Sequence, residues 1–143
     1  MLISTRGRYA LRILVDMAEH SFDKYTKLKD IAHRQEISEK YLESIVKTLV
    51  KNNIVIGLRG KGGGYRLAME PDQINIGVVL TVMEETLAPV ACLEDSSEPC
   101  ARAASCRTLK FWRGLDDVIK HYTHSFTIAD LMRNSEAGYD YII

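Results

Sequence analysis

The stretch from Thr26 to Ala68 constrains the fold more than any other part of the chain, because it holds two short helical patterns joined by a tight turn. Thr26 is a residue type that caps helices, and apolar residues follow it at helical spacing: Leu28, Ile31 and Ala32. Ser38 has the same capping character for a second helix. That helix repeats apolar residues at i, i+3, i+4 and i+7, which predicts one buried face: Leu42, Ile45, Val46 and Leu49. Two helices so closely joined predict a helix-turn-helix.

The other face of the second helix is polar and partly basic, as expected of a recognition helix that reads DNA. Its side chains can donate or accept hydrogen bonds or stack. The candidate DNA-binding residues of this helix are Ser38, Lys40, Tyr41, Glu43, Ser44 and Lys47.

A glycine-rich hairpin is predicted directly after the recognition helix. Residues 55–59 and 65–68 have the composition of two strands, and four of the five residues between 60 and 64 are glycine. Glycine lets the backbone take positive φ and approach another surface closely. Arg59 and Lys61 place cations at this tip, so we expect them to contact phosphate or the minor groove. A flexible turn without function explains the glycines alone, but the preceding helix-turn-helix favours a DNA-binding wing.

Charge is distributed unevenly along a chain whose formal net charge is zero. Residues 1–71 hold 13 Lys and Arg against 8 Asp and Glu, whereas residues 72–143 hold 6 against 11. A basic front half suits a polyanion and an acidic rear half does not. We therefore expect contact with double-stranded DNA to be confined to residues 1–71.

Composition and hydropathy narrow the class of protein further. With 46% hydrophobic and 27% charged residues, the 143-residue chain has enough apolar residues for a core and no mark of disorder. No stretch approaches transmembrane length, and the N-terminus lacks a basic segment followed by an apolar run. We therefore expect a cytoplasmic protein without a membrane partner, whose cysteines are kept reduced.

The segments that flank the helix-turn-helix supply the rest of its core. Ser4 is expected to cap a first helix with an apolar stripe at Ala10, Ile13, Leu14, Met17 and Ala18. Its polar side carries Arg6, Arg8 and Arg12, which either contact phosphate or remain solvated charges. Pro71 closes the winged unit, and Asn75 caps a helix with one apolar face at Ile76, Val79, Leu80 and Met83.

Three cysteines, the only ones in the chain, lie within fifteen residues: Cys92, Cys100 and Cys106. The prolines, serines and acids around them predict a loop over residues 91–105, and a loop can bring separated thiolates to one point. Thiolate is the ligand that iron–sulfur clusters and zinc select. Cysteines also serve as small buried apolar residues, but this polar segment is a poor place for such a role. A disulfide would leave one thiol over and is disfavoured in the cytoplasm.

A longer helix is predicted from Cys106 to Tyr122. Leu109, Trp112, Leu115, Ile119 and Tyr122 are spaced almost as in a coiled-coil seam, and Phe111 and Val118 widen the stripe. Such a broad apolar face predicts packing on a second copy, and a homodimer would read a near-palindromic operator. The alternative is a helix folded back on its own domain. Thr127 and Asp130 predict a capping box for a last short helix, and residues 134–143 are expected to form a loosely ordered tail.

The expected fold class is mainly α with a small β-hairpin wing, that is, a winged helix-turn-helix plus a long dimerisation helix. Residues 1–71 form the DNA-binding domain. Residues 72–143 hold the packing helix, the cysteine loop (91–105), the dimerisation helix (106–122), the C-terminal helix and the tail. No nucleophile–base pair, paired carboxylates or phosphate-binding loop is present, so we do not expect an enzyme.

Several motifs together resemble the Rrf2 family of winged-helix transcription regulators, in particular its three-cysteine, iron–sulfur type. They are LISTRGRYALRIL, ISEKYLESIVKTLVKNNIV, GLRGKGGGYRLA and the cysteine loop before a long helix, and the likeness extends to about Leu131. The resemblance implies a homodimeric repressor whose three cysteines hold a 2Fe-2S or 4Fe-4S cluster. It also implies that the cluster responds to redox, nitric oxide or iron–sulfur status and that its state controls DNA binding. Tyr41, Glu43 and Arg59 match DNA-binding positions of the family.

The chain departs from the family pattern at the fourth cluster ligand. Some members carry a histidine three residues after the third cysteine, where this chain has Leu109, and others use an aspartate where it has Arg8. Oxygen donors are available within the loop itself, at Glu94, Asp95 and Glu98. The main alternative function is a DNA-binding regulator of the same fold whose cysteines bind zinc or act directly as a thiol redox switch.

Overall fold

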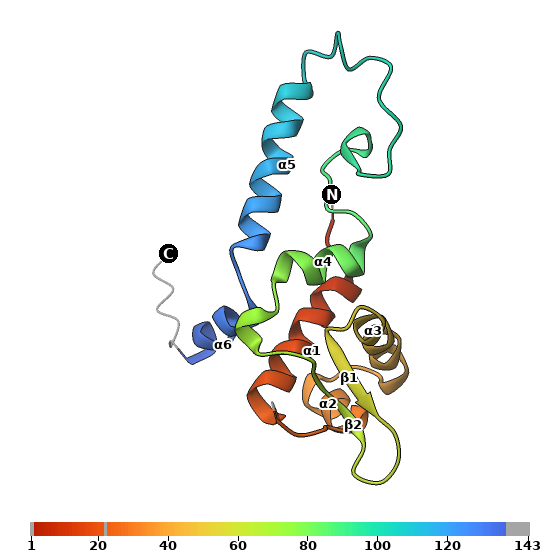
Figure 1. The fold of residues 1–143 in the computed structure, drawn as a ribbon, viewed down its shortest axis with the longest axis vertical. Coiled ribbons are helices and arrows are strands. Elements are labelled where there is room, and N and C mark those ends of the chain that lie inside the picture. The colour runs from red at the N-terminus through yellow and green to blue at the C-terminus, as the bar shows by residue number, and fades with distance from the viewer. Residues whose placement is uncertain (1, 22, 137–143) are drawn as a thin grey trace.

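The computed structural model describes residues 2–21 and 23–136, and it is mostly helical with one two-stranded hairpin (Figure 1). The α-helices are α1 (Thr5–Ser21), α2 (Leu28–Gln35), α3 (Glu39–Lys51), α4 (Ile76–Glu84), α5 (Leu109–His124) and α6 (Ile128–Glu136). The strands are β1 (Val55–Leu58) and β2 (Gly64–Leu67), and the 3-10 helices are η1 (Pro71–Gln73) and η2 (Ala91–Leu93). None of the helices described is long and apolar enough to cross a membrane. The predicted fold class is confirmed.

Capping residues begin three helices where the sequence predicts them. The Ser4 hydroxyl accepts from the Gly7 amide at 3.2 Å, and the Ser38 hydroxyl accepts from the Tyr41 amide at 3.2 Å. The Asn75 carboxamide accepts from the Val78 amide at 3.3 Å. Each cap satisfies an amide that has no partner within its helix, so it fixes where the helix begins.

The core forms around α1. All the apolar residues predicted to be buried on α1, α3 and α4 are buried, and Ile31 and Ala32 join them from α2. Residues beyond Pro71 share this core, since Val79 of α4 and Ile128 of α6 belong to the same cluster as Ile13 of α1. The boundary at residue 71 stays a prediction, and α4 and α6 pack directly on the winged unit.

The wing contains a third extended segment that the sequence did not predict. β1 and β2 are antiparallel, with Val55 opposite Leu67 and Leu58 opposite Gly64. Thr26 pairs with Tyr65 at the edge of this sheet through two backbone hydrogen bonds of 2.9 and 2.8 Å. The predicted N-cap role of Thr26 is therefore wrong: Lys27 occupies the cap of α2 without a side-chain hydrogen bond, because Thr26 is held in the sheet.

The cysteine loop and α5 project away from the winged unit, at the opposite end of the molecule from the wing tip (Figure 1). α5 begins at Leu109 rather than at Cys106 and ends at His124. The start is later than predicted because the Cys106 amide is bonded to the Ala103 carbonyl in a loop turn, and the Thr108 carbonyl is the first that accepts a helical hydrogen bond. The base of α5 is tied to α4, since Asn75 Nδ2 donates to the His124 carbonyl at 2.7 Å.

The C-terminal helix follows the predicted capping pattern but runs further than expected. Asp130 Oδ2 accepts from the Thr127 amide at 2.8 Å and from its hydroxyl at 3.0 Å. α6 continues to Glu136, so residues 134–136, predicted as part of a loose tail, are helical. The rest of the predicted tail, 137–143, lies outside the described residues.

Candidate DNA interface and cysteine loop

The turn between α2 and α3 sets the angle of the recognition helix. Glu36 ends α2 in the left-handed region, with φ 54°. The Ile37 amide then bonds back to the Ala32 carbonyl at 3.1 Å, and the Ile37 side chain is buried beneath the turn. A left-handed residue reverses the chain within a single turn, so α3 crosses α2 with its polar face outward.

Two predicted DNA-binding residues of α3 already form an ion pair. Lys47 Nζ lies 3.1 Å from Glu43 Oε1, one helical turn away, and both side chains are largely open to solvent. Lys40, one turn before Glu43, is exposed as well. These three residues form the outward face of α3, and DNA binding would have to exchange the Glu43–Lys47 pair for contacts to bases and phosphates.

Two other predicted residues, Tyr41 and Ser44, face α1 in this structure. The Tyr41 ring meets the Tyr9 ring edge to face, with centroids 5.9 Å apart. The Ser44 hydroxyl donates to the Tyr41 carbonyl at 2.7 Å and accepts from Arg6 at 3.4 Å. Their DNA contacts stay predictions. The structure adds a second role for both residues, in the seam between α1 and α3.

Each arginine on the polar side of α1 is hydrogen-bonded within the protein, and one of them joins α1 to α3. Arg6 Nη2 donates to the Thr48 hydroxyl at 2.5 Å and to the Ser44 carbonyl at 3.2 Å, which joins α1 to the middle of α3. Arg12 donates to the Gln35 side chain and carbonyl at the end of α2. Arg8 reaches only Thr5, at 2.9 Å, on its own helix.

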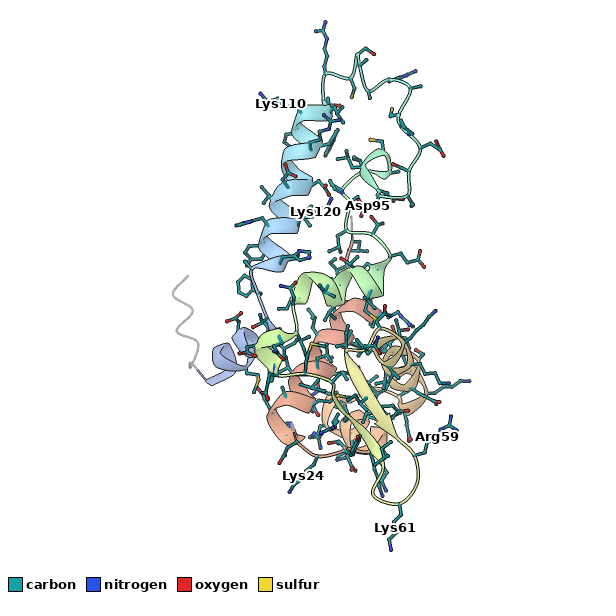
Figure 2. All side chains as sticks on the ribbon, viewed as in Figure 1. Lys24, Arg59, Lys61, Asp95, Lys110 and Lys120 are labelled. Carbon is teal, nitrogen blue, oxygen red and sulfur yellow. The ribbon has the colours of Figure 1, made fainter. Side chains whose placement is uncertain are left out.

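The wing tip exposes the two predicted cations. Arg59 and Lys61 extend outward at the end of the hairpin (Figure 2), and neither forms a hydrogen bond or ion pair with any residue that the structure describes. The tip depends on glycine: Gly60 and Gly62 have φ of 92° and 76°, and a side chain at Gly63 would collide with the Leu58 carbonyl. This arrangement leaves both cations free for phosphate.

A buried ionic network, which the sequence analysis missed, fixes α2 against α1. The Asp16 carboxylate is 0% exposed and accepts from Arg34 Nε at 3.0 Å, Arg34 Nη2 at 2.6 Å and Gln35 Nε2 at 2.8 Å. Hydrogen bonding to Asp16 raises the pKa of Arg34 above its ordinary value. The signal in the sequence was an acid at i+3 from Ile13, on the face of α1 that is otherwise apolar.

The cysteine loop carries its three thiols in separate turns. Cys92 lies in η2, and its carbonyl accepts from the Ser97 hydroxyl at 3.3 Å. The Cys100 carbonyl accepts from the Ala103 amide at 3.0 Å, and Cys106 lies just before α5. All three thiols are exposed, and among the described residues no three metal-ligating side chains are gathered at one point.

The chemistry of this donor set suits an iron–sulfur cluster, although the loop must close to bring the thiols together. Hydrogen bonds from the Thr108 hydroxyl and from the amides of Thr108 and Leu109 lower the pKa of Cys106 below its ordinary value. They favour the thiolate, which is the form that binds iron. Solvent exposure lets all three residues move without disturbing the core. The donor set therefore fits the group that the family resemblance implies.

The outer face of α5 is apolar and uncovered by the part of the chain that the structure describes. Phe111, Val118 and Tyr122 are 65%, 64% and 64% exposed. Asp116 is the one residue of α5 that is buried, and it pairs with Lys120 at 2.8 Å. α5 contacts α4 near its C-terminal end (Figure 1), and Ile119 packs against the core. The dimer seam and its alternative, a helix folded back on its own domain, both stay predictions.

Comparison with known proteins finds relatives that match nearly the whole chain. A family model described as Rrf2, an iron-dependent transcriptional regulator, matches residues 3–134. Protein rrf2 of Nitratidesulfovibrio vulgaris is 40% identical over 136 residues, which are 94% of this chain and 89% of that protein. The solved structure of T. potens IscR is 32% identical with a TM-score of 0.75, covering 97% of this chain and 92% of that one. CymR, the global cysteine regulator of B. subtilis, is 37% identical with a TM-score of 0.75, covering 94% of this chain and 98% of that one.

Proposed function

This chain belongs to the Rrf2 family of transcriptional regulators, and on that premise we propose that it is a homodimeric, DNA-binding repressor of the cytoplasm. Its affinity for its operator would follow redox, nitric oxide or iron–sulfur status. The matching family model is described as a transcriptional regulator and CymR is named a regulator, so the chain is a transcriptional regulator and not an enzyme. The observation that carries the sensory proposal is the exposed three-cysteine loop, which leads directly into a helix with an uncovered apolar face.

Double-stranded DNA is the partner of the winged unit. Lys40, Glu43 and Lys47 form the outward face of α3, positioned to reach base edges and adjacent phosphates. Arg59 and Lys61 at the wing tip supply sequence-independent attraction to phosphate or the minor groove. The hydrogen bonds of Arg6 hold α3 against α1, and the Asp16–Arg34 network holds α2 against α1, so α3 presents one geometry to DNA.

A second copy of the chain is the partner proposed for α5. Phe111, Val118 and Tyr122 lie along one side of a helix that its own chain leaves exposed, and contiguous apolar surface of this kind marks an interface. Pairing two α5 helices about a two-fold axis would place two winged units side by side. Such a dimer matches a near-palindromic operator with half-sites about one helical turn of DNA apart.

Cys92, Cys100 and Cys106 are the residues proposed to hold an iron–sulfur cluster. When bound, such a cluster supplies a centre that responds to oxidants, nitric oxide and iron supply. The chain's own contribution is a thiolate-favouring environment at Cys106 and a loop whose turns can be drawn together. Neither Leu109 nor Arg8 offers a fourth ligand. The loop carboxylates Glu94, Asp95 and Glu98 are the nearest alternatives along the chain.

Regulation has to cross the length of the molecule, because the loop and the wing lie at opposite ends (Figure 1). α5 provides the connection, since it begins three residues after Cys106 and its base is bonded to α4, which packs on α1. Closing the loop would change the first turn of α5 and so the way two winged units are held apart. Coupling of this kind is typically about 1–3 kcal/mol, or about 5- to 150-fold in affinity.

Anaerobic purification tests the cofactor. We expect a brown protein with visible absorption, containing iron and acid-labile sulfide, and a colourless Cys92→Ala, Cys100→Ala, Cys106→Ala variant of the same mass as the wild-type protein in solution. A colourless wild-type protein, after reconstitution with iron and sulfide has also been attempted, would contradict the proposal.

The second candidate is the same DNA-binding regulator without a cluster. It is favoured by the three exposed thiols, which the described structure does not gather at one point. In this case the cysteines bind zinc or respond directly to oxidants. A colourless protein that contains stoichiometric zinc, or whose DNA binding changes on mild oxidation, would support it.

A further inference from the structure

The side chain of Lys120 extends from α5 toward the cysteine loop. Its Nζ is 2.8 Å from Asp116 Oδ2, one turn earlier on the same helix. The Asp116 side chain is only 10% exposed, and its other oxygen has no hydrogen-bond partner among the described residues. A buried carboxylate with half of its hydrogen bonding unmet depends strongly on its one cation, so Lys120 is constrained by more than a surface ion pair.

The opposite side of Lys120 faces the loop. Lys120 lines a pocket of about 390 Å³ with Glu94 and Asp95 of the loop, with Thr81 of α4 and with Glu85, which follows α4. Figure 2 shows Lys120 and Asp95 extending toward one another across this space. Asp95 also contributes to the raised pKa of Lys120, after the larger effect of the Asp116 hydrogen bond. Asp95 is thus within electrostatic range of the ammonium without forming an ion pair with it.

Asp95 moves with Cys92 because one hydrogen-bonded turn contains both. The Glu94 amide bonds to the Ala91 carbonyl at 3.2 Å, and the Ser97 amide bonds to the Glu94 carbonyl at 2.9 Å. The Ser97 hydroxyl closes the turn on the Cys92 carbonyl at 3.3 Å. A displacement of Cys92 is therefore transmitted to Asp95, three residues away.

We propose that Lys120 is a positioning residue that attaches the Cys92 turn to α5 through Asp95 while it neutralises buried Asp116. The attachment rests on the structure alone, and its regulatory consequence rests on the proposed function. When the loop closes on its centre, Asp95 shifts relative to Lys120, and the pairing of a buried carboxylate changes in the middle of the proposed dimer helix. The cysteine loop would then affect α5 through a second connection, in addition to the continuous backbone at Cys106.

Amide hydrogen exchange on the full-length protein, freed of iron by chelation, tests the attachment. Lys120→Met and Asp95→Asn should each speed exchange at residues 91–97 by about two- to five-fold, the range of a weak attraction between solvent-exposed charges. The double variant should exchange no faster than Lys120→Met alone, since that change already removes the attraction between Lys120 and Asp95. The effect should shrink at high salt, and Lys120→Arg should restore protection. Lys110→Met is the matched control, because Lys110 forms no ion pair with the residues described on or around α5.

The proposal is overturned if Lys120→Met behaves like Lys110→Met, or if the effects of Lys120→Met and Asp95→Asn simply add. Asp95→Asn excludes a destabilised α5 as the cause of faster exchange in the loop, because this variant leaves the Lys120–Asp116 pair intact. The assay uses neither cluster nor DNA. A colourless wild-type protein would therefore contradict the proposed function and leave this measurement valid.

Discussion

Replacing Asp16 by Ala should destabilise the protein by about 2–3 kcal/mol. Removing one partner of a buried ion pair typically costs about 3–5 kcal/mol, because the other charge is left without compensation. Here Asp16 is 0% exposed but the Arg34 side chain is 30% exposed, so the freed guanidinium can recover part of its hydration. Gln35 loses a hydrogen bond of 2.8 Å as well. The recovered hydration of Arg34 lowers the cost and the lost hydrogen bond of Gln35 raises it by less. The expected free-energy loss therefore lies just below the usual range.

The assay is urea unfolding followed by far-ultraviolet circular dichroism. We expect the midpoint to fall without a change in slope, and the melting temperature to drop by about 8–12 °C. Arg34→Ala should cost as much or more, since it leaves the buried carboxylate unpaired, and the double variant should cost less than the sum of the two.

Arg8→Ala is the matched control, because Arg8 is exposed on the same helix and bonds only to Thr5. It should stay within about 0.5 kcal/mol of wild type. If Asp16→Ala were equally mild, the network could not be what fixes α2 against α1.

The remaining predictions concern DNA and thiol chemistry. Arg59→Ala should weaken binding to specific and random DNA alike and lower the salt slope by about one, and an unchanged slope would remove the wing from the interface. Glu43→Ala should relax sequence preference while affinity for DNA stays equal or rises, because a carboxylate repels phosphate and its removal frees Lys47. A uniform loss of affinity across all DNA sequences would contradict this prediction. Cys106 should react with iodoacetamide faster than a model thiol at pH 7, because its lowered pKa populates the thiolate at lower pH, and Thr108→Val should slow it.

The fold was predictable because its signals are local. Side-chain caps at Ser4, Ser38 and Asn75 and apolar spacing on three helices locate most of the winged unit, and the glycine-rich tip predicts the hairpin. The prediction failed where a long-range contact determined the structure. Thr26 is a residue type that caps helices, but it is bonded to Tyr65 in the sheet. The pairing of residues so distant in the chain is not visible in either segment alone.

For the candidate site residues, the sequence indicates which side chains are exposed better than which contacts they make. The exposed positions of Lys40, Arg59 and Lys61 follow from helical phase and from the glycines around the wing. Tyr41 and Ser44 share the polar face by sequence, yet they turn toward α1 because Tyr9 and Arg6 offer partners there. Such partners depend on how two helices cross, which periodicity does not determine.

Buried charge was the main omission. Asp16 and Asp116 each interrupt an apolar face, and each is neutralised by a cation: Arg34 on a different helix, and Lys120 one turn along the same helix. The second pair has the i, i+4 spacing that identifies it in a sequence, whereas the first requires the fold. An acid inside an apolar stripe is therefore a useful indication of a hidden ionic contact.

Operator affinity measured with and without the cysteines tests most directly whether the cysteine loop regulates DNA binding. The wild-type protein, reconstituted with iron and sulfide, and the Cys92→Ala, Cys100→Ala, Cys106→Ala variant would be compared on a duplex selected by the wild-type protein from a random pool, with the mass of each in solution measured alongside. We predict that both are dimers and that their affinities differ by about 5- to 150-fold, the range of typical allosteric coupling. Equal affinities would contradict regulation through the loop, and a monomeric variant would mean that the centre builds the dimer instead of tuning it.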